Sequence, residues 1–456
     1  MNKRIPLTRT LFCTLTLAFA TSTISAGELS DMATAALQND NQLKVAAAQR
    51  NVVVESKAIA VSALYPLAAA SASLTQTKVL DAGLQAIIPG SGGGGNVASS
   101  IDSYETLNYG ASVQQSLFNW ESFQGYRKSQ VDVDQAELTY KLALQDLYNR
   151  LITGYFSVQS AQSSLEANQN LVVSSERELE KQRKALSAGL GTTTDVLAAE
   201  ASLSSAMAAV INDRTSRQAA ESALSLITGT ATSARKQLSR DLPLIPPAPA
   251  SLQQWKDLAL QENLALLAAQ KAVRSSELQR KAAYGGFLPK VVGVGAISSS
   301  NNSTSNNDVS SYYYGVSASL PLFSGGGASA KLRQADEAYK SAVAKFELTK
   351  AQLLSDVATH FSGAVSGIEN IKAAQKAVQA NEANVVGIEV SAKVGARSVT
   401  DSLIARNNLA QAQRNAYIAK LRYLNNLIAL KADIGRLSAQ TVSELDGLFT
   451  ETIVLQ

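Results

Sequence analysis

The sequence predicts a mixed α and β membrane protein, in which long helices form antiparallel coiled-coil hairpins and four strands supply part of a barrel wall. Two observations carry this prediction. A hydrophobic repeat of seven residues runs without proline through residues 119–195 and again through 324–401. Four other runs alternate apolar with small or polar residues, which is the pattern of membrane-spanning strands.

The seven-residue repeat predicts two long helices with an apolar seam. It is aliphatic at Leu144, Leu151, Val158, Leu165, Val172, Leu179 and Leu186, and it recurs at Val357, Ala364, Ile371, Val378, Val385 and Ala392. A period of 3.5 residues keeps one stripe of a helix against a partner. At 1.5 Å per residue, a helix from Trp120 to Ser187 would be roughly 100 Å long.

Each long helix should end in a tight turn followed by a return helix. The segments Gly189–Asp195 and Gly395–Asp401 both begin with glycine and end in Thr-Asp. Glycine adopts the left-handed conformation that stops a helix, and Thr followed by Asp caps the next one with negative charge. We therefore expect helical hairpins with tips at 187–195 and 393–401.

The repeat divides the chain into two units that follow the same scheme of helix, strand hairpin, long helix, tip and return helix. The first unit spans 27–228, with one helix over 29–64 and a strand hairpin at 67–118. The second spans 256–436, with a strand hairpin at 290–323. A proline-rich linker at 229–255 joins them, and a tail of weak pattern fills 437–456.

The first 26 residues predict an export signal. Lys3, Arg4 and Arg9 precede the apolar run 11–20, and Ile24-Ser25-Ala26 is a plausible cleavage site. No later stretch of about 20 apolar residues is expected to form a transmembrane helix. Cys13, the only cysteine, lies inside the signal, so the mature chain should have no disulfide, lipid anchor or cysteine metal site.

The charge balance argues against nucleic acid as a partner. Charged residues make up 17% of the chain, and removing the three cations of the signal from 41 basic residues leaves 38, against 37 acidic residues. A nearly neutral chain lacks the positive surface on which nucleic-acid binding depends.

The strand pattern is clearest near residue 315. Tyr312, Tyr314, Val316, Ala318, Leu320 and Leu322 alternate with Gly315, Ser317, Ser319 and Pro321, and the preceding strand places Val292, Val294 and Ala296 on one face. Loops are expected at 81–107 and 301–311. A soluble sandwich is the alternative. Four strands cannot close a membrane barrel, since such barrels start at about eight strands, so two or three copies would have to share one.

This arrangement resembles the TolC-type outer membrane efflux protein family, and the segment Val394–Leu403 carries the most specific part of the resemblance. The resemblance implies a homotrimer in the outer membrane of a Gram-negative bacterium, with a shared 12-strand barrel and a periplasmic tube of paired coiled coils. An equatorial belt would form around 229–255 and the tail. The implied partners are a periplasmic adaptor and an inner membrane ABC or proton-driven pump. The cargo would be proteins, by type I secretion, or small toxic compounds, by efflux.

The resemblance also implies working residues at the tips. Asp401 would form a ring of three carboxylates at the pore constriction, while Asp195 and Arg397 would tether neighbouring hairpins. The sequence departs from the family at Ala392 and Ile404, where a gate tyrosine and a second carboxylate would stand. Adaptor docking would involve Gly189, Leu190, Gly191, Val394, Gly395 and Ala396.

Simpler structural roles compete with each of these assignments. Asp401 and Asp195 could be helix N-caps, Arg397 a solvated turn residue, and the glycines requirements of the turns. No nucleophile and base pattern suggests an enzyme, no cofactor motif is present, and His360, the only histidine, is expected to pack in the tube wall. The rival function is a periplasmic or surface coiled-coil scaffold or adhesin without channel activity.

Overall fold

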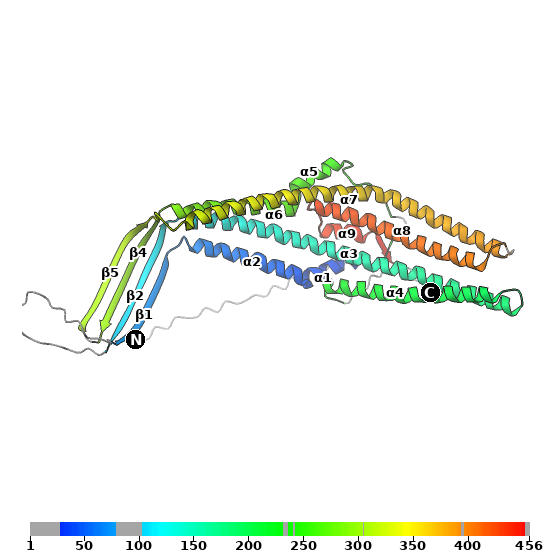
Figure 1. Cartoon of the computed structure of the whole chain (residues 1–456), viewed down its shortest axis with the longest axis horizontal. Coiled ribbons are helices and arrows are strands. Elements are labelled where there is room, and N and C mark those ends of the chain that lie inside the picture. Colours follow the sequence, from blue (N-terminus) through cyan, green and yellow to red (C-terminus); the bar gives the residue numbers. More distant parts are fainter. Residues whose placement is uncertain are drawn as a thin grey trace, which may run out of the picture.

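The computed structural model describes residues 28–78, 103–230, 236–239, 242–303, 305–393 and 396–451. It is an elongated molecule with a curved sheet at one end and two helical tips at the other (Figure 1). The helices are α1 (Glu28–Asn39), α2 (Asn41–Ser62), α3 (Trp120–Ser187), α4 (Thr193–Thr228), α5 (Leu252–Glu262), α6 (Leu264–Ala283), α7 (Gly327–Lys393), α8 (Val399–Asp433) and α9 (Ala439–Asp446), with a 3₁₀ turn η1 (Tyr284–Phe287). The strands are β1 (Leu67–Lys78), β2 (Ser103–Phe118), β3 (Lys236–Leu238), β4 (Lys290–Asn302), β5 (Ser305–Ser319) and β6 (Phe449–Glu451).

Two helices, α3 and α7, run from the sheet to the tips. In the half nearer the sheet α3 packs with α2 and α6, and in the half nearer the tips it packs with α4, while α7 packs first with α6 and then with α8 (Figure 1). The heptad seam faces these partners where it is most buried, at Leu151, Val158, Val357 and Ile371. The expected mixed fold of helical hairpins and a four-stranded sheet is confirmed.

Buried polar residues break the helix that precedes each sheet hairpin. Asp40 separates α1 from α2 and accepts a hydrogen bond from Leu43 N at 2.7 Å, and Asn263 separates α5 from α6 and accepts one from Leu266 N at 2.8 Å. The single helix expected over 29–64 is therefore two helices, because an N-cap side chain stabilises a new helix start inside the apolar period.

An ion pair holds the first break in place. Arg150 of α3 donates from both terminal nitrogens to the Asp40 carboxylate, at 3.0 and 3.1 Å. Burial opposes ionisation of this carboxyl, but the Arg150 and Leu43 hydrogen bonds outweigh it and keep the pKa of Asp40 below its usual range.

The large sheet is antiparallel, in the order β1-β2-β4-β5. Residues directly opposite one another share a face, so Ala72 with Tyr109, Ala68 with Val113, and Ala111 with Ile297 lie on one side. Tyr312 is opposite Ile297 and joins the same side. This face is apolar across all four strands and is largely exposed, with Tyr314 84% accessible. The other face carries mainly serine, threonine, glycine and glutamine.

Strand β4 keeps the expected alternation, with Val292, Val294 and Ala296 on one face, but this is not the apolar face of the sheet. Its Val292, Val294 and Ala296 lie opposite Ser317, Gly315 and Tyr313, so they belong to the polar face of the sheet. On the apolar face of the sheet, β4 carries Gly293 and Gly295 instead. Because glycine has no side chain, the sequence of β4 alone does not show which of its faces joins the apolar side of the sheet. The strands also extend into both predicted loops: β2 begins at Ser103, and β4 and β5 cover most of 301–311.

A small belt lies against the middle of the long helices, at the linker and tail where the family resemblance led us to expect one, although the residue pattern alone indicated no strand or helix there. Strand β3 pairs with β6, and α9 packs on α1. Phe449 meets Tyr155 edge to face, with ring centroids 5.0 Å apart. The buried Tyr417 hydroxyl donates to Gln159 Oε1 at 2.8 Å and accepts from Leu238 N, and burial raises the pKa of Tyr417 to about 12. The tail therefore helps to build the core.

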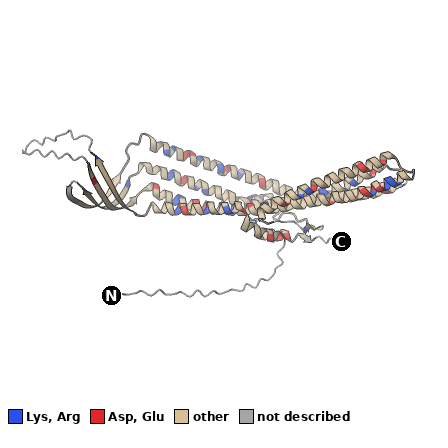
Figure 2. Ribbon diagram, turned by 90° about the horizontal axis from the view of Figure 1, so that it is seen from below, with Lys and Arg blue, Asp and Glu red and all other residues tan. Residues whose placement is uncertain are grey.

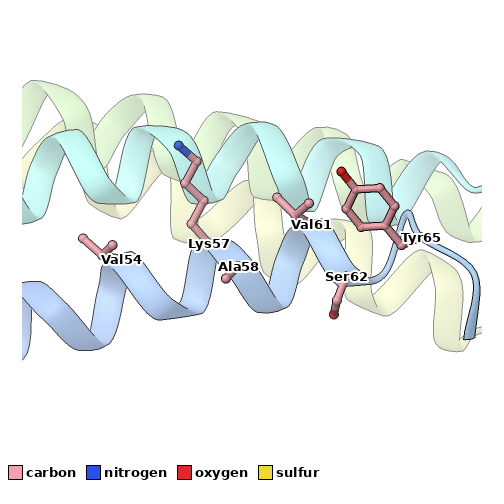
Figure 3. A pocket seen from close by; sticks show the side chains of 6 residues that line it. All are labelled: Val54, Lys57, Ala58, Val61, Ser62 and Tyr65. Carbon is pink, nitrogen blue, oxygen red and sulfur yellow. The ribbon is translucent and has the colours of Figure 1, made fainter. Parts of the chain in front are cut away.

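Two helices keep apolar faces in solvent. On α2, Val52 is 65% exposed, and Figure 3 shows Lys57, Val61 and, just beyond the end of the helix, Tyr65 on one side of the chain, where they line a shallow groove. On α4, Leu226 is 83% exposed. Of the described helices, α4 also meets a length and composition test for a membrane span, contrary to our expectation. Its alanine-rich, weakly charged composition equally suits packing between other helices, so this evidence is weak.

Gly435 should be intolerant of a side chain. It has φ +69°, and an added Cβ would lie 2.6 Å from the Glu262 carbonyl oxygen. Gly435→Ala should cost about 1–2 kcal/mol from the left-handed backbone alone and lower the melting temperature of the purified protein. Gly387→Ala is the control: this helical glycine has open space around it, so alanine should raise stability by about 0.5–1 kcal/mol. Equal melting temperatures for the two variants would contradict the expectation.

Candidate functional site

The two helical tips are built alike. In the first, Gly189 has φ +72° and Leu190 N donates to Ala185 O at 2.9 Å; in the second, Ala396 N donates to Ser391 O at 3.0 Å. Leu190 is 86% exposed at the end of the molecule. Val394 and Gly395 lie outside the described residues.

The caps of the return helices differ from the prediction. Thr192 and Ser398 are the N-caps, and each forms a capping box with the aspartate three residues later, Asp195 or Asp401. The threonines next to the aspartates, Thr194 and Thr400, are not the caps, and neither aspartate is itself an N-cap. The capping box accounts for the positions of these side chains, because each residue of the pair accepts a hydrogen bond from the backbone N–H of the other.

Asp195 and Arg397 line one groove but form no ion pair with each other in this chain. The groove has a volume of about 530 Å³ and lies between the two hairpins. The Asp195 carboxylate accepts from Thr192 Oγ1 at 2.6 Å, and Arg397 is exposed. Ala392 also lines this groove, at the position where the family resemblance led us to expect a tyrosine.

Asp401 is partly exposed on the first turn of α8. Hydrogen bonds from the backbone and hydroxyl of Ser398, aided by the charge of Arg397, hold the pKa of Asp401 below its usual range. The carboxylate is therefore ionised in the single chain at neutral pH. Ile404, one turn later, is 53% exposed, so α8 presents an apolar residue beyond the aspartate.

An ionic cluster that the sequence did not reveal joins the two hairpins just behind the tips. Arg406 of α8 donates to Ser174 O of α3 at 2.9 Å and to Glu389 Oε1 of α7 at 2.8 Å. The same guanidinium lies 3.6 Å from Glu178 Oε2 of α3. We call Arg406, Glu178 and Glu389 the Arg406 clamp.

Two of the three members of the clamp are shielded from solvent, whereas the side chain of Glu389 is 42% exposed. The side chain of Glu178 is 5% exposed and that of Arg406 is 18% exposed. Gln182 donates to Glu178 Oε1 at 2.6 Å, so both carboxylate oxygens have partners. Beside it, Leu179, Ala199 and Leu403 form a small apolar cluster between α3, α4 and α8. These contacts, and not the Asp195–Arg397 pair, hold the hairpins together within the chain.

Charged residues are common at the tips and rare in the sheet (Figure 2). Figure 2 shows acidic and basic residues interspersed along the helices and gathered near the tips, whereas the sheet is almost uncharged. Among the described residues, no group of three or more histidine, cysteine, aspartate or glutamate side chains is placed to hold a metal ion.

The fold and these tips define a class of protein. The chain matches the model of the outer membrane efflux protein family over residues 32–230 and 255–436. It belongs to this family, whose members are channels and not enzymes. The family places the sheet in the outer membrane and the helical part in the periplasm.

Individual relatives support the same class. The outer membrane protein TolC of Vibrio cholerae is 26% identical over 452 residues, covering 98% of both chains. The alkaline protease secretion protein AprF of Pseudomonas aeruginosa is 26% identical over 326 residues, covering 70% of this chain and 68% of that protein. Among solved structures, the CmeC outer membrane channel of Campylobacter jejuni has a TM-score of 0.76 at 16% identity, covering 98% of this chain and 97% of CmeC.

Removing the guanidinium of the Arg406 clamp should loosen the tip. Arg406→Ala removes the guanidinium that lies 3.6 Å from the buried Glu178 and leaves that carboxylate only the exposed Lys181, at 3.4 Å. Breaking a fully buried pair costs about 3–5 kcal/mol, and the cost here should be smaller because Lys181 remains. We expect faster amide hydrogen exchange in the first half of α8, measured by mass spectrometry. Adding Glu178→Gln should restore part of the protection. Unchanged exchange in the single variant would show that the clamp does not hold the hairpins.

Proposed function

We propose that three copies of this chain form a channel across the outer membrane that exports substrates together with a periplasmic adaptor and an inner membrane pump. The observation that carries the proposal is the sheet: it has four strands with β1 and β5 at its edges, and its apolar face is exposed. In a bilayer every backbone group must be paired, so the edges must bond to other copies.

The number of copies follows from the strand count and from the family. Three copies give twelve strands, within the range of known membrane barrels. The exposed apolar faces of α2 and α4 support the proposal, because large apolar surfaces on a soluble protein mark interfaces. The polar face of the sheet, with its serines and glycines, would line the passage.

The tips are the proposed closing point and the proposed contact with the adaptor. Asp401 would face its counterparts in the other copies, and like charges held close together raise the pKa of at least one member. Asp195 and Arg397 would pair between adjacent copies, since they do not pair within one. Gly189, Leu190, Gly191, Val394, Gly395 and Ala396 would meet the adaptor, with the Arg406 clamp behind them.

The cargo is set by the pump in this proposal. AprF and the proteases secretion protein PrtF of Dickeya chrysanthemi are named for protein secretion, and BepC of Brucella suis is named an outer membrane efflux protein. Both cargo classes suit a duct that has no nucleotide-binding motif of its own. A scaffold without a pore would leave the apolar sheet face, including Leu74 and Tyr314, without a purpose.

Conductance in planar lipid bilayers tests the channel. The wild-type protein should show a small conductance because its tips are closed, and Arg406→Ala should raise it several-fold. Arg414→Ala is the matched control, because Arg414 lies on the same helix and donates only to Gln411, one turn away. A protein that carbonate extracts from outer membranes and that conducts no ions would refute the proposal.

The carboxylate ring can be tested in the same apparatus. Asp401→Asn removes three negative charges from the proposed constriction, so the preference of the channel for cations should fall. Asp213→Asn on α4, where the carboxylate accepts from Asn168 at 2.5 Å, should leave the selectivity unchanged. The measurement is the reversal potential under a salt gradient, and equal values for Asp401→Asn and the wild-type protein would contradict the ring.

A further inference from the structure

The end of α8 farthest from the tip is fastened to α7 by a histidine. His360 Nδ1 lies 2.7 Å from Asp433 Oδ2, and Asp433 is the last residue of α8. The two side chains are 29% and 15% exposed, so they are shielded yet within reach of protons from solvent. His360 is the only histidine in the sequence.

The geometry makes this pair depend on charge. A carboxylate at the C-terminal end of a helix lies beside unpaired carbonyl groups and the negative end of the helix dipole, which is unfavourable. A protonated imidazole offsets both. A neutral imidazole can still donate one hydrogen bond, but a charge-assisted bond is roughly twice as strong.

Two hydrogen bonds between uncharged groups also hold the C-terminal end of α8, which we call the joint. Asn263 at the start of α6 donates to Asp433 O at 2.8 Å, and Gln145 of α3 donates to Ala432 O at 2.7 Å. Below the pair lies an apolar cluster that includes Val357, Leu430 and Trp255. Four helices therefore meet at the end of α8, and His360 supplies the titratable contact.

The charged groups around the imidazole favour its protonated form. Asp433 faces it from α8, and Asp356 lies one turn earlier on α7. A second ion pair lies nearby: Arg436 donates two hydrogen bonds of 2.7 Å to Glu262 at the end of α5, so the charges of this pair offset each other. The hydrogen bond to Asp433 outweighs partial burial and raises the pKa of His360.

We propose that the His360–Asp433 pair is a pH-responsive latch, which holds the C-terminal end of α8 on α7 when the imidazole is protonated and loosens it when the proton leaves. Because α8 also carries Asp401 and Arg406 near its other end, loosening the latch removes one of the two fastenings that resist a shift of α8 at the tip. This last consequence rests on the proposed channel function; the latch itself does not.

The sign of the pH effect follows from the direction of the shift. The folded pKa lies above the unfolded value, so the stabilising contribution is fully present below about pH 6.5, the ordinary histidine value. It is lost as the pH rises through the folded pKa. The protein should therefore be most firmly latched in mildly acidic medium and should loosen towards alkaline pH.

The experiment uses the full-length protein, labelled on histidine and purified with a tag that contains no histidine, so that one imidazole signal titrates in the NMR spectrum. We expect a pKa above that of free histidine in the wild-type protein and a lower pKa in Asp433→Asn. Asp257→Asn, an exposed residue of α5 bonded to Gln253, is the control and should leave the titration unchanged. An identical titration in wild type and Asp433→Asn would overturn the latch.

A second measurement separates the latch from the channel. The melting temperature of the wild-type protein should fall as the pH rises through the pKa of His360, and His360→Gln should remove that component. In bilayers, the open probability should rise over the same interval in wild type only. If neither protein conducts but the titration and melting results hold, the channel proposal fails and the latch stands. If His360→Gln melts with the same pH profile as wild type, the latch fails.

Discussion

The unpaired edges of the four-stranded sheet constrain the whole molecule. Strand β1 follows α2 directly, and β5 leads into α7. When β5 of one copy bonds to β1 of the next, α7 of the first copy must lie beside α2 of the second. The exposed apolar residues on these helices, Leu348 on α7 and Val52 and Ile59 on α2, then find a partner. A requirement of backbone hydrogen bonding in lipid therefore explains why helices outside the membrane carry apolar faces.

The same geometry distributes stability unevenly along the helices. The heptad seam is fully buried at the belt, where Val158 and Ile371 meet the core around Tyr155. Towards the tips it becomes partly exposed, as Leu186 and Val385 show. Segments with few buried apolar contacts open most easily, so the tips depend more on polar contacts than the belt does. A closing device placed there can be opened without unfolding the belt.

Elements with a regular repeat along the chain could be predicted from the sequence, whereas contacts between residues far apart in the sequence could not. The seven-residue repeat located α3 because every turn of a long helix repeats the same evidence. The sequence did not show which face of β4 joins the apolar side of the sheet. One face carries valines and the other glycines, and only the register with β5 decides which of the two lies on that side. The belt was expected only from the family resemblance, because β3 and β6 have three residues each and pair across more than 200 positions, so the residue pattern did not show them.

The candidate site shows the same division. The glycine and aspartate of each tip form a local motif, so the turns could be predicted, although the capping residue was assigned two positions too close to the aspartate. Arg406 gave no signal, because its partner Ser174 is 232 residues away and Glu389 lies on another helix. The family resemblance directed attention to Asp195 and Arg397, whose bond, if formed, needs a second copy.

The two fastenings of α8 impose a chemical condition on whatever opens the channel. Arginine remains charged at any physiological pH, so the rise in pH that loosens the His360 pair leaves the Arg406 guanidinium charged and its clamp in place. Separating Arg406 from Glu178 leaves a buried carboxylate whose remaining cation is the exposed Lys181, 3.4 Å away, and this is costly unless water or another cation takes the place of the guanidinium. A partner that opens the tip must therefore either admit water to Glu178 or bring a basic side chain to it. The groove that holds Glu178 also reaches Leu190 and Arg397, so one surface is available for both docking and this exchange.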